Sequence, residues 1–186
     1  MKGLEKRFIK RMNTEVTFIG FGALEIGRDW GLGAGNETAK PSDESAGEVL
    51  NKVLDIGINL VDTASAYHRS EERIGKYISN RRNEYVLASK CGEHSDEPRT
   101  YYDYSYSAIK DSIDKSLLNL KTDVIDLMQI HFGPEPENVI EEGETVRAMR
   151  DAQKEGKVKY LGASIDGELA KRCILSGHFD VIQMDY

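Results

Sequence analysis

The chain has 186 residues, 39% of them hydrophobic. This length and composition are typical of one globular domain, which is expected to comprise residues 1–186. Its net charge of −7 argues against nucleic acid as a partner, because phosphate binding requires a basic face. No stretch approaches the roughly 18 apolar residues of a membrane span, and no apolar segment of about 7–15 residues follows the basic N-terminus as in a signal peptide.

Strand-like and helix-like segments alternate along the chain. Runs of β-branched, aromatic and aliphatic residues predict strands over 16–22, 58–62, 85–90, 125–131, 159–164 and 179–186. Apolar residues at helical spacing predict helices over about 46–57, 70–78, 109–120, 138–155 and 166–177. Ser70 and Asp166 are expected to cap two of these helices, and Glu71 and Glu72 to benefit from the dipole of the first turn. The basic segment KGLEKRFIKR (2–11) is interpreted as a solvated strand edge.

This alternation implies right-handed crossovers and a parallel sheet, and the nearly continuous apolar strands are expected when both of its faces are covered. An open doubly wound sheet would carry G-x-G-x-x-G after its first strand, but residues 20–25 read G-F-G-A-L-E. A (β/α)8 barrel instead places polar functional residues at the C-terminal ends of many strands. Such residues lie at or near strand ends here, namely Asp62, Lys90, His131, Ser164 and Gln183. The sequence therefore favours an α/β fold of the (β/α)8 barrel type.

Four side chains of different chemistry are expected on one rim of this sheet: Asp62, Tyr67, Lys90 and His131. They are the groups needed to hand a proton to a carbonyl oxygen while a hydride arrives from elsewhere. Each residue alone has an ordinary structural interpretation, such as a helix cap, a rim aromatic or a core histidine. Lys90 is the hardest to explain structurally, because burying an unpaired ammonium is costly.

Longer motifs surround these residues: LDIGINLVDTASAYHRSEERIG (54–75), YVLASKCG (85–92), IDLMQIH (125–131), GKVKYLGAS (156–164) and FDVIQMDY (179–186). In this order and spacing they resemble the aldo-keto reductase family, and the resemblance extends from about Val16 to the last residue. The resemblance implies reduction of aldehydes or ketones with NADPH as the cofactor.

The resemblance also implies a role for each site residue. Tyr67 would be the general acid, Lys90 would place a positive charge beside its phenol, and Asp62 would hold Lys90 in place. His131 would orient the substrate carbonyl. Ser164 and Gln183 match positions that hold the nicotinamide carboxamide. No metal is implied.

Several positions depart from the family pattern or suggest further roles. His68 stands where the family usually has glycine, and it either narrows the pocket or points outward. Ile165 replaces an asparagine that often follows the carboxamide serine. Trp30 either lines a substrate pocket or packs on the surface. Four tyrosines form either a substrate wall or a packed loop: Tyr101, Tyr102, Tyr104 and Tyr106.

Length is the largest departure. A complete barrel has eight βα units in about 250 residues or more, whereas this sequence predicts six strands and resembles the first two-thirds of a reductase. The family segments that grip the cofactor's pyrophosphate and adenosine phosphate have no counterpart here. The barrel is therefore expected to be incomplete, with unpaired apolar edges at 16–22 and 179–186 that favour self-association.

Three hypotheses about function follow. The first is an NADPH-dependent carbonyl reductase, the second a Schiff-base lyase using Lys90, and the third an inactive remnant or binding module. Only two cysteines occur, Cys91 and Cys173, which is too few for a disulfide framework. Both are expected to be small buried hydrophobes in a reducing cytoplasm.

Overall fold

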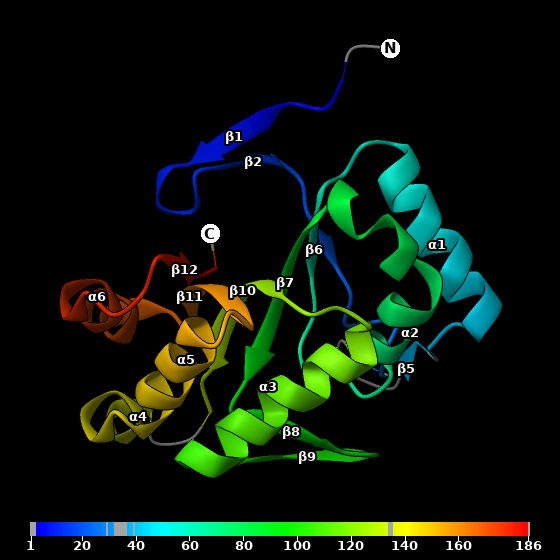
Figure 1. The fold of residues 1–186 in the computed structure, drawn as a ribbon. Coiled ribbons are helices and arrows are strands. Elements are labelled where there is room, and N and C mark those ends of the chain that lie inside the picture. The colour runs from blue at the N-terminus through cyan, green and yellow to red at the C-terminus, as the bar shows by residue number, and fades with distance from the viewer. Residues whose placement is uncertain (1–2, 29, 32–36, 39, 134–135, 186) are drawn as a thin grey trace.

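The computed structural model describes residues 3–28, 30–31, 37–38, 40–133 and 136–185. At its centre lies a six-stranded parallel sheet whose strand order, β12-β11-β10-β7-β6-β3, follows the order of the chain. The strands are β3 (Phe21–Gly22), β6 (Leu60–Asp62), β7 (Val86–Cys91), β10 (Ile125–His131), β11 (Val158–Ser164) and β12 (Val181–Gln183). The sheet curls, and helices pack along its outer side (Figure 1). The α/β class and the partial barrel expected from the sequence are confirmed.

Amphipathic helices form the outer layer of the molecule. They are α1 (Asp43–Asp55), α2 (Ser70–Tyr77), α3 (Tyr106–Leu120), α4 (Pro136–Glu142), α5 (Glu144–Lys154) and α6 (Gly167–Ser176), with 3₁₀ helices at Lys10–Met12 and Ser79–Glu84. Their apolar faces meet the outer face of the sheet in one core that includes Leu50, Ile74, Ile113, Met128 and Met149. Cys91 and Cys173 are both fully buried, as expected, and neither is in a disulfide.

An N-terminal hairpin closes one end of the curled sheet. Its strands β1 (Lys6–Ile9) and β2 (Thr14–Thr17) pair antiparallel, and it lies at the end where the parallel strands begin (Figure 1). Met12 and Val16 pack against Val86, Ala88 and Leu127 of the inner face in a second, smaller core. The opposite end of the sheet, where the strands finish, carries the polar residues.

The prediction of one strand over 16–22 is wrong in one respect, because this segment forms two strands that belong to different sheets. The first part belongs to the hairpin, where the Thr17 amide donates to the Asn59 side chain over 2.6 Å. Only Phe21–Gly22 joins the parallel sheet, and between the two strands Phe18 and Ile19 are exposed. The basic N-terminal segment does form a solvent-exposed strand, as expected.

The predicted helix over 138–155 is also wrong as a single element. Gly143 adopts a left-handed φ of +69°, which separates α4 from α5. Neither expected capping side chain caps its helix. The Ser70 hydroxyl donates to the Ala23 carbonyl (2.7 Å), and the Asp166 carboxylate accepts from the Asp185 amide (2.7 Å).

Two further hairpins were not expected from the sequence. Strands β8 (Glu93–Asp96) and β9 (Arg99–Tyr102) pair antiparallel beyond β7, at the end of the sheet where the parallel strands finish (Figure 1). Strands β4 (Trp30–Gly31) and β5 (Glu37–Thr38) form the other. The side chain of Trp30 lies outside the described part of the chain, so its expected role is not tested. Within the described segments, none of the helices combines the length and apolar character needed to cross a bilayer.

Candidate active site

Lys90 forms the centre of the site. Its side chain is 2% exposed, and its Nζ donates to Asp62 Oδ2 (2.6 Å) and to the Thr63 carbonyl (3.0 Å), and lies 3.4 Å from the Tyr67 hydroxyl. The register explains the pairing: Asp62 lies opposite Ala88 on the neighbouring strand, so Lys90, two residues further on, shares its face. These contacts compensate the buried ammonium, which would be costly without a counter-ion.

Tyr67 follows β6 in a tight turn, with its amide bonded to the Ala64 carbonyl (3.0 Å). Its ring centroid lies 5.1 Å from Lys90 Nζ and 5.5 Å from Arg28 Cζ, so two cations lie near the phenol. The turn also packs closely against the first long loop, because a Cβ at Gly27 would lie 1.9 Å from the Tyr67 carbonyl oxygen. Arg28, on that loop, was not anticipated as a neighbour of the site.

His131 ends β10 and begins a row of rim residues. In the strand registers His131 lies opposite Ser164, and Ser164 lies opposite Gln183. These three residues, with Ile165 among others, line one cavity of about 380 Å³. The His131 ring is also perpendicular to the Tyr67 ring, with the two centroids 6.0 Å apart. The structure therefore gathers all six residues predicted from the sequence along one rim.

Gln129 links the two halves of this rim and was not predicted from the sequence. Its Nε2 donates to Asp62 Oδ1 (3.3 Å) and to Gln183 Oε1 (2.8 Å), and its side chain is almost fully buried. A signal for it exists in the sequence, because in a strand that ends at His131 the residue two positions earlier shares the same face.

Glu93 is the second missed residue. Its Oε2 lies 2.8 Å from His131 Nδ1, a short contact that is bent away from ideal hydrogen-bond alignment. Burial of the Glu93 carboxyl favours its neutral form, but His131, Thr100 and Arg28 together outweigh burial and hold its pKa at about 2. A charged residue one glycine after a fully buried strand, in KCGE, was the available signal.

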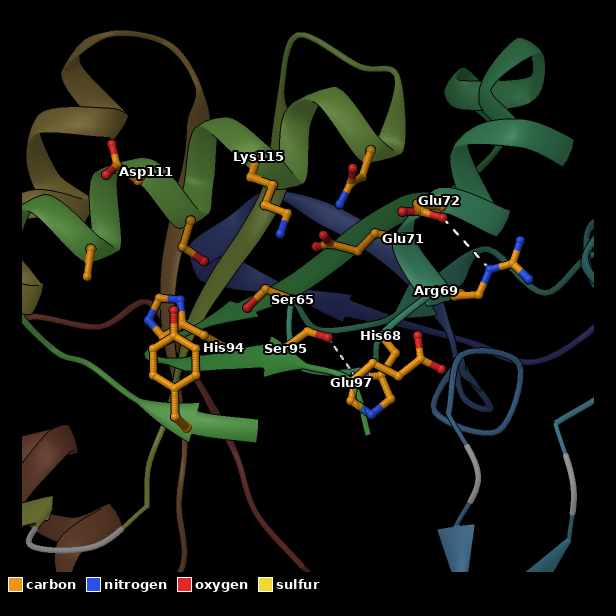
Figure 2. A pocket seen from close by; sticks show the side chains of 14 residues that line it. Ser65, His68, Arg69, Glu71, Glu72, His94, Ser95, Glu97, Asp111 and Lys115 are labelled. Atoms are coloured by element: carbon orange, nitrogen blue, oxygen red, sulfur yellow. Dashed lines mark hydrogen bonds and ion pairs between the residues drawn. The ribbon is translucent and has the colours of Figure 1, made fainter. Parts of the chain in front are cut away.

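His68 adopts a left-handed φ of +46°, which explains why glycine would suit this position. Its Nδ1 lies 2.6 Å from Ser95 Oγ, and its side chain lines a separate cavity of about 370 Å³ beside α2, α3 and the β8–β9 hairpin (Figure 2). Of the four tyrosines, Tyr102 and Tyr104 stack with ring centroids 6.1 Å apart, and the Tyr104 hydroxyl donates to the His131 carbonyl (3.0 Å), whereas Tyr101 borders the second cavity.

The residues beside the 380 Å³ cavity fit a carboxamide. Ser164 offers a hydroxyl. The Gln183 Oε1 already accepts from Gln129, so the Gln183 side chain offers its NH2 group as a hydrogen-bond donor. A nicotinamide carboxamide, with one acceptor oxygen and one NH2 group, complements such a pair. Across the described residues there is no grouping of three or more histidine, cysteine, aspartate or glutamate side chains suited to a metal ion.

The fold is a partial (β/α)8 barrel that carries an aspartate, a tyrosine, a lysine and a histidine together on one rim, an arrangement suited to an acid–base enzyme of the barrel class. The model of the aldo/keto reductase family matches residues 18–183. The chain therefore belongs to the aldo/keto reductase family.

Individual relatives agree with this assignment. An uncharacterised oxidoreductase of Bacillus subtilis is 31% identical across 98% of this chain and 56% of its own length. An NADH-specific methylglyoxal reductase of Escherichia coli is 26% identical across 96% of this chain and 59% of its own length. The structure of an aldo-keto reductase from Bacillus halodurans superposes with a TM-score of 0.80 at 29% identity, covering 98% of this chain and 58% of that one. The chain thus spans somewhat more than half the length of these relatives.

Proposed function

We propose that this chain carries the acid–base site of an NAD(P)H-dependent reductase of aldehydes or ketones. The observation that supports the proposal best is the Lys90 ammonium, which is bound to Asp62 and lies 3.4 Å from the Tyr67 hydroxyl. A reduced nicotinamide, when bound, supplies the hydride. The chain's own residues supply the proton and hold the carbonyl.

In this proposal the Tyr67 hydroxyl gives its proton to the carbonyl oxygen. The phenolate that remains is stabilised by the Lys90 ammonium, since an opposite charge at this distance favours the ionised form. Asp62 keeps the ammonium in place, and Gln129 braces the second carboxylate oxygen. His131, whose ring stands perpendicular to the Tyr67 ring, binds the substrate carbonyl oxygen on the side away from Tyr67.

The cofactor part of the proposal rests on Ser164 and Gln183, which would hold the nicotinamide carboxamide. We propose NADPH as the preferred form, and the chain as the first six βα units of the family barrel. Because the relative from Escherichia coli is named as NADH-specific, titrations with both nucleotides are the direct measure of preference. The cytoplasmic location stays a prediction.

The lyase alternative is disfavoured by the state of Lys90. Forming an imine requires an amine that can reach the substrate carbonyl, whereas the Lys90 Nζ is buried and donates to Asp62 and to the Thr63 carbonyl. Borohydride trapping with a carbonyl substrate separates the two hypotheses, and we expect no adduct on Lys90. The third hypothesis, an inactive remnant or binding module that lacks the cofactor clamp, is tested by measuring whether the purified chain binds a nicotinamide cofactor.

The test of the reductase is Tyr67→Phe in the natural protein that contains this chain. We expect carbonyl reduction to fall about 10²–10⁴-fold, because a general acid is removed, while the dissociation constant for NADPH stays the same. The measurement is oxidation of the reduced nucleotide with a panel of aldehydes and ketones. Lys90→Met is expected to act in the same direction.

Tyr101→Phe is the matched control, because Tyr101 is an exposed tyrosine of β9 outside the rim. Its activity should equal that of the wild type. Full activity in Tyr67→Phe would show that another group supplies the proton.

A further inference from the structure

The β8–β9 hairpin brings an acidic side chain to the rim of the sheet. Cys91 ends β7 opposite Ile130 of β10, and the chain then turns at Gly92, whose φ is +100°. A Cβ at Gly92 would lie 2.5 Å from the Tyr104 ring, so this turn requires glycine. Beyond the turn, Glu93 faces the last residue of the neighbouring strand, His131.

The hairpin is fastened to the loop that carries Tyr67 as well. The Ser65 hydroxyl donates to the Glu93 carbonyl (2.8 Å), and Ser95 contacts His68 on the far side of the same loop, as the dashed line in Figure 2 marks. Ser65 and His68 flank Tyr67 in the sequence. The backbone of Glu93 is thus held in register with both the tyrosine and the histidine of the site.

The Glu93 carboxylate is buried and charged. Its residue is 5% exposed, its Oε1 lies 3.6 Å from an Arg28 nitrogen, and its Oε2 lies 2.8 Å from His131 Nδ1. A pKa of about 2 means that the carboxylate is ionised at neutral pH and only accepts hydrogen bonds. Two lone pairs would repel at 2.8 Å, so Nδ1 must carry a proton, although its N–H is not aligned with the carboxylate oxygen.

We propose that Glu93 is a positioning residue that fixes both the ring orientation and the Nδ1 proton of His131. This leaves Nε2, on the opposite edge of the ring, as the nitrogen offered to the substrate. The consequence of this proposal for catalysis rests on the proposed function, whereas the orientation of the His131 ring and the position of its proton do not. In imidazole the partner of one nitrogen selects the state of the other, and here that partner comes from a hairpin outside the parallel sheet.

The structure also shows that no other described side chain is placed to hold the His131 ring through Nδ1. His131 Nδ1 is fully buried, while 22% of the side chain is exposed, so the exposed part of the ring lies away from Glu93. The Tyr104 hydroxyl binds the His131 carbonyl and holds its backbone, not its ring. Among the described residues, the contact between Nδ1 and Glu93 Oε2 is the polar contact of the ring nitrogens of His131.

The test is nitrogen NMR of the 186-residue chain labelled at its histidines. There are four histidines in the chain, so His131→Asn assigns the signal by its loss. In the wild type we expect the neutral ring to carry its proton on Nδ1. In Glu93→Leu and in Glu93→Ala we expect that signal to be lost in favour of Nε2–H, the tautomer that a free imidazole side chain prefers.

Glu97→Leu is the matched control, because Glu97 lies beyond the same strand, pairs with Lys40 and is largely exposed. It should leave the His131 signals unchanged. A wild-type ring protonated on Nε2 would overturn the proposal without any variant, as would an unchanged tautomer in a folded Glu93→Leu. The measurement needs no turnover, so failure of the proposed reductase activity would be seen separately, in the rate assay.

Discussion

At the scale of single residues, Glu71 shows how far a side chain can depart from its sequence context. Its place in the first turn of α2 predicts a solvated carboxylate that benefits from the helix dipole. In the structure it is 2% exposed, accepts from Ser89 Oγ (2.7 Å) and faces the 370 Å³ cavity (Figure 2). Burial, the largest influence, raises the pKa of the Glu71 carboxyl despite the Ser89 hydroxyl that opposes it.

This burial leads to a pH-dependent prediction for Glu71→Gln. The unfolded carboxyl loses its proton near its ordinary pKa, whereas the folded one retains it to higher pH, so folded-state stability declines as pH rises through that window. A glutamine keeps an acceptor for Ser89 and carries no charge. We expect its Tm at pH 8 to exceed that of the wild type by at least about 2–4 °C, the shift that about 1 kcal/mol produces. The difference should close by pH 4.

Glu72→Gln is the control for this experiment, since Glu72 is the next residue of the same helix and its side chain is 58% exposed. Its Tm should match the wild type at both pH values within about 2 °C, as for most surface changes. Equal melting of Glu71→Gln and the wild type at pH 8 would mean that the buried carboxyl is ionised without cost.

At the scale of elements, the break between α4 and α5 shows the limit of hydrophobic periodicity. Apolar spacing continues across residues 138–155, and buried residues such as Val139 and Val146 lie on both sides of the break. The pattern therefore reads as one helix. The backbone at Gly143 is left-handed instead, a conformation that glycine adopts without steric cost.

We expect Gly143→Ala to destabilise the chain by about 1–2 kcal/mol, the cost of a left-handed conformation for a residue with a Cβ. The cost comes from the backbone alone, because a Cβ at this position would have no other atom within 4 Å. Urea unfolding measures it. Gly22→Ala is the control: its Cβ would also meet open space, and its φ is not positive, so stability should stay within about 0.5 kcal/mol. Equal stabilities of the two variants would show that the break tolerates an ordinary residue.

At the scale of the whole molecule, the parallel sheet has two edges, β3 and β12. A closed barrel has none. Large apolar side chains are exposed near both, including Phe18 (67%) and Ile19 (61%) before β3, and Leu175 (75%) and Met184 (54%) near β12. Open strand edges flanked by apolar surface favour pairing with other chains.

We therefore predict that the 186-residue chain self-associates through these edges. Sedimentation velocity at increasing concentration should show a species larger than the monomer of 20.9 kDa. The double variant Phe18→Lys, Leu175→Lys should shift the distribution toward monomer, while the control Leu118→Lys, an equally exposed site on α3, should not. A wild-type chain that stays monomeric at all concentrations would contradict the prediction.

The sequence by itself determined the alternation of strands and helices, the barrel class, and the six polar residues at the rim. Those features are local: hydrophobic period identifies each element, and parallel strands bring their C-terminal residues to one edge whatever the details of packing. The specific pairing of Asp62 with Lys90 was implied by the family resemblance, and the structure places the two side chains 2.6 Å apart.

Only the tertiary structure decided the partners of those residues. Gln129 meets Asp62 and Gln183, Glu93 meets His131, and Glu71 turns inward to Ser89, over separations of 18 to 67 residues. The division of the first strand between two sheets belongs here as well. Such contacts depend on how the hairpins and helices pack, and a short stretch of sequence does not encode packing because its energy comes from segments that are distant along the chain.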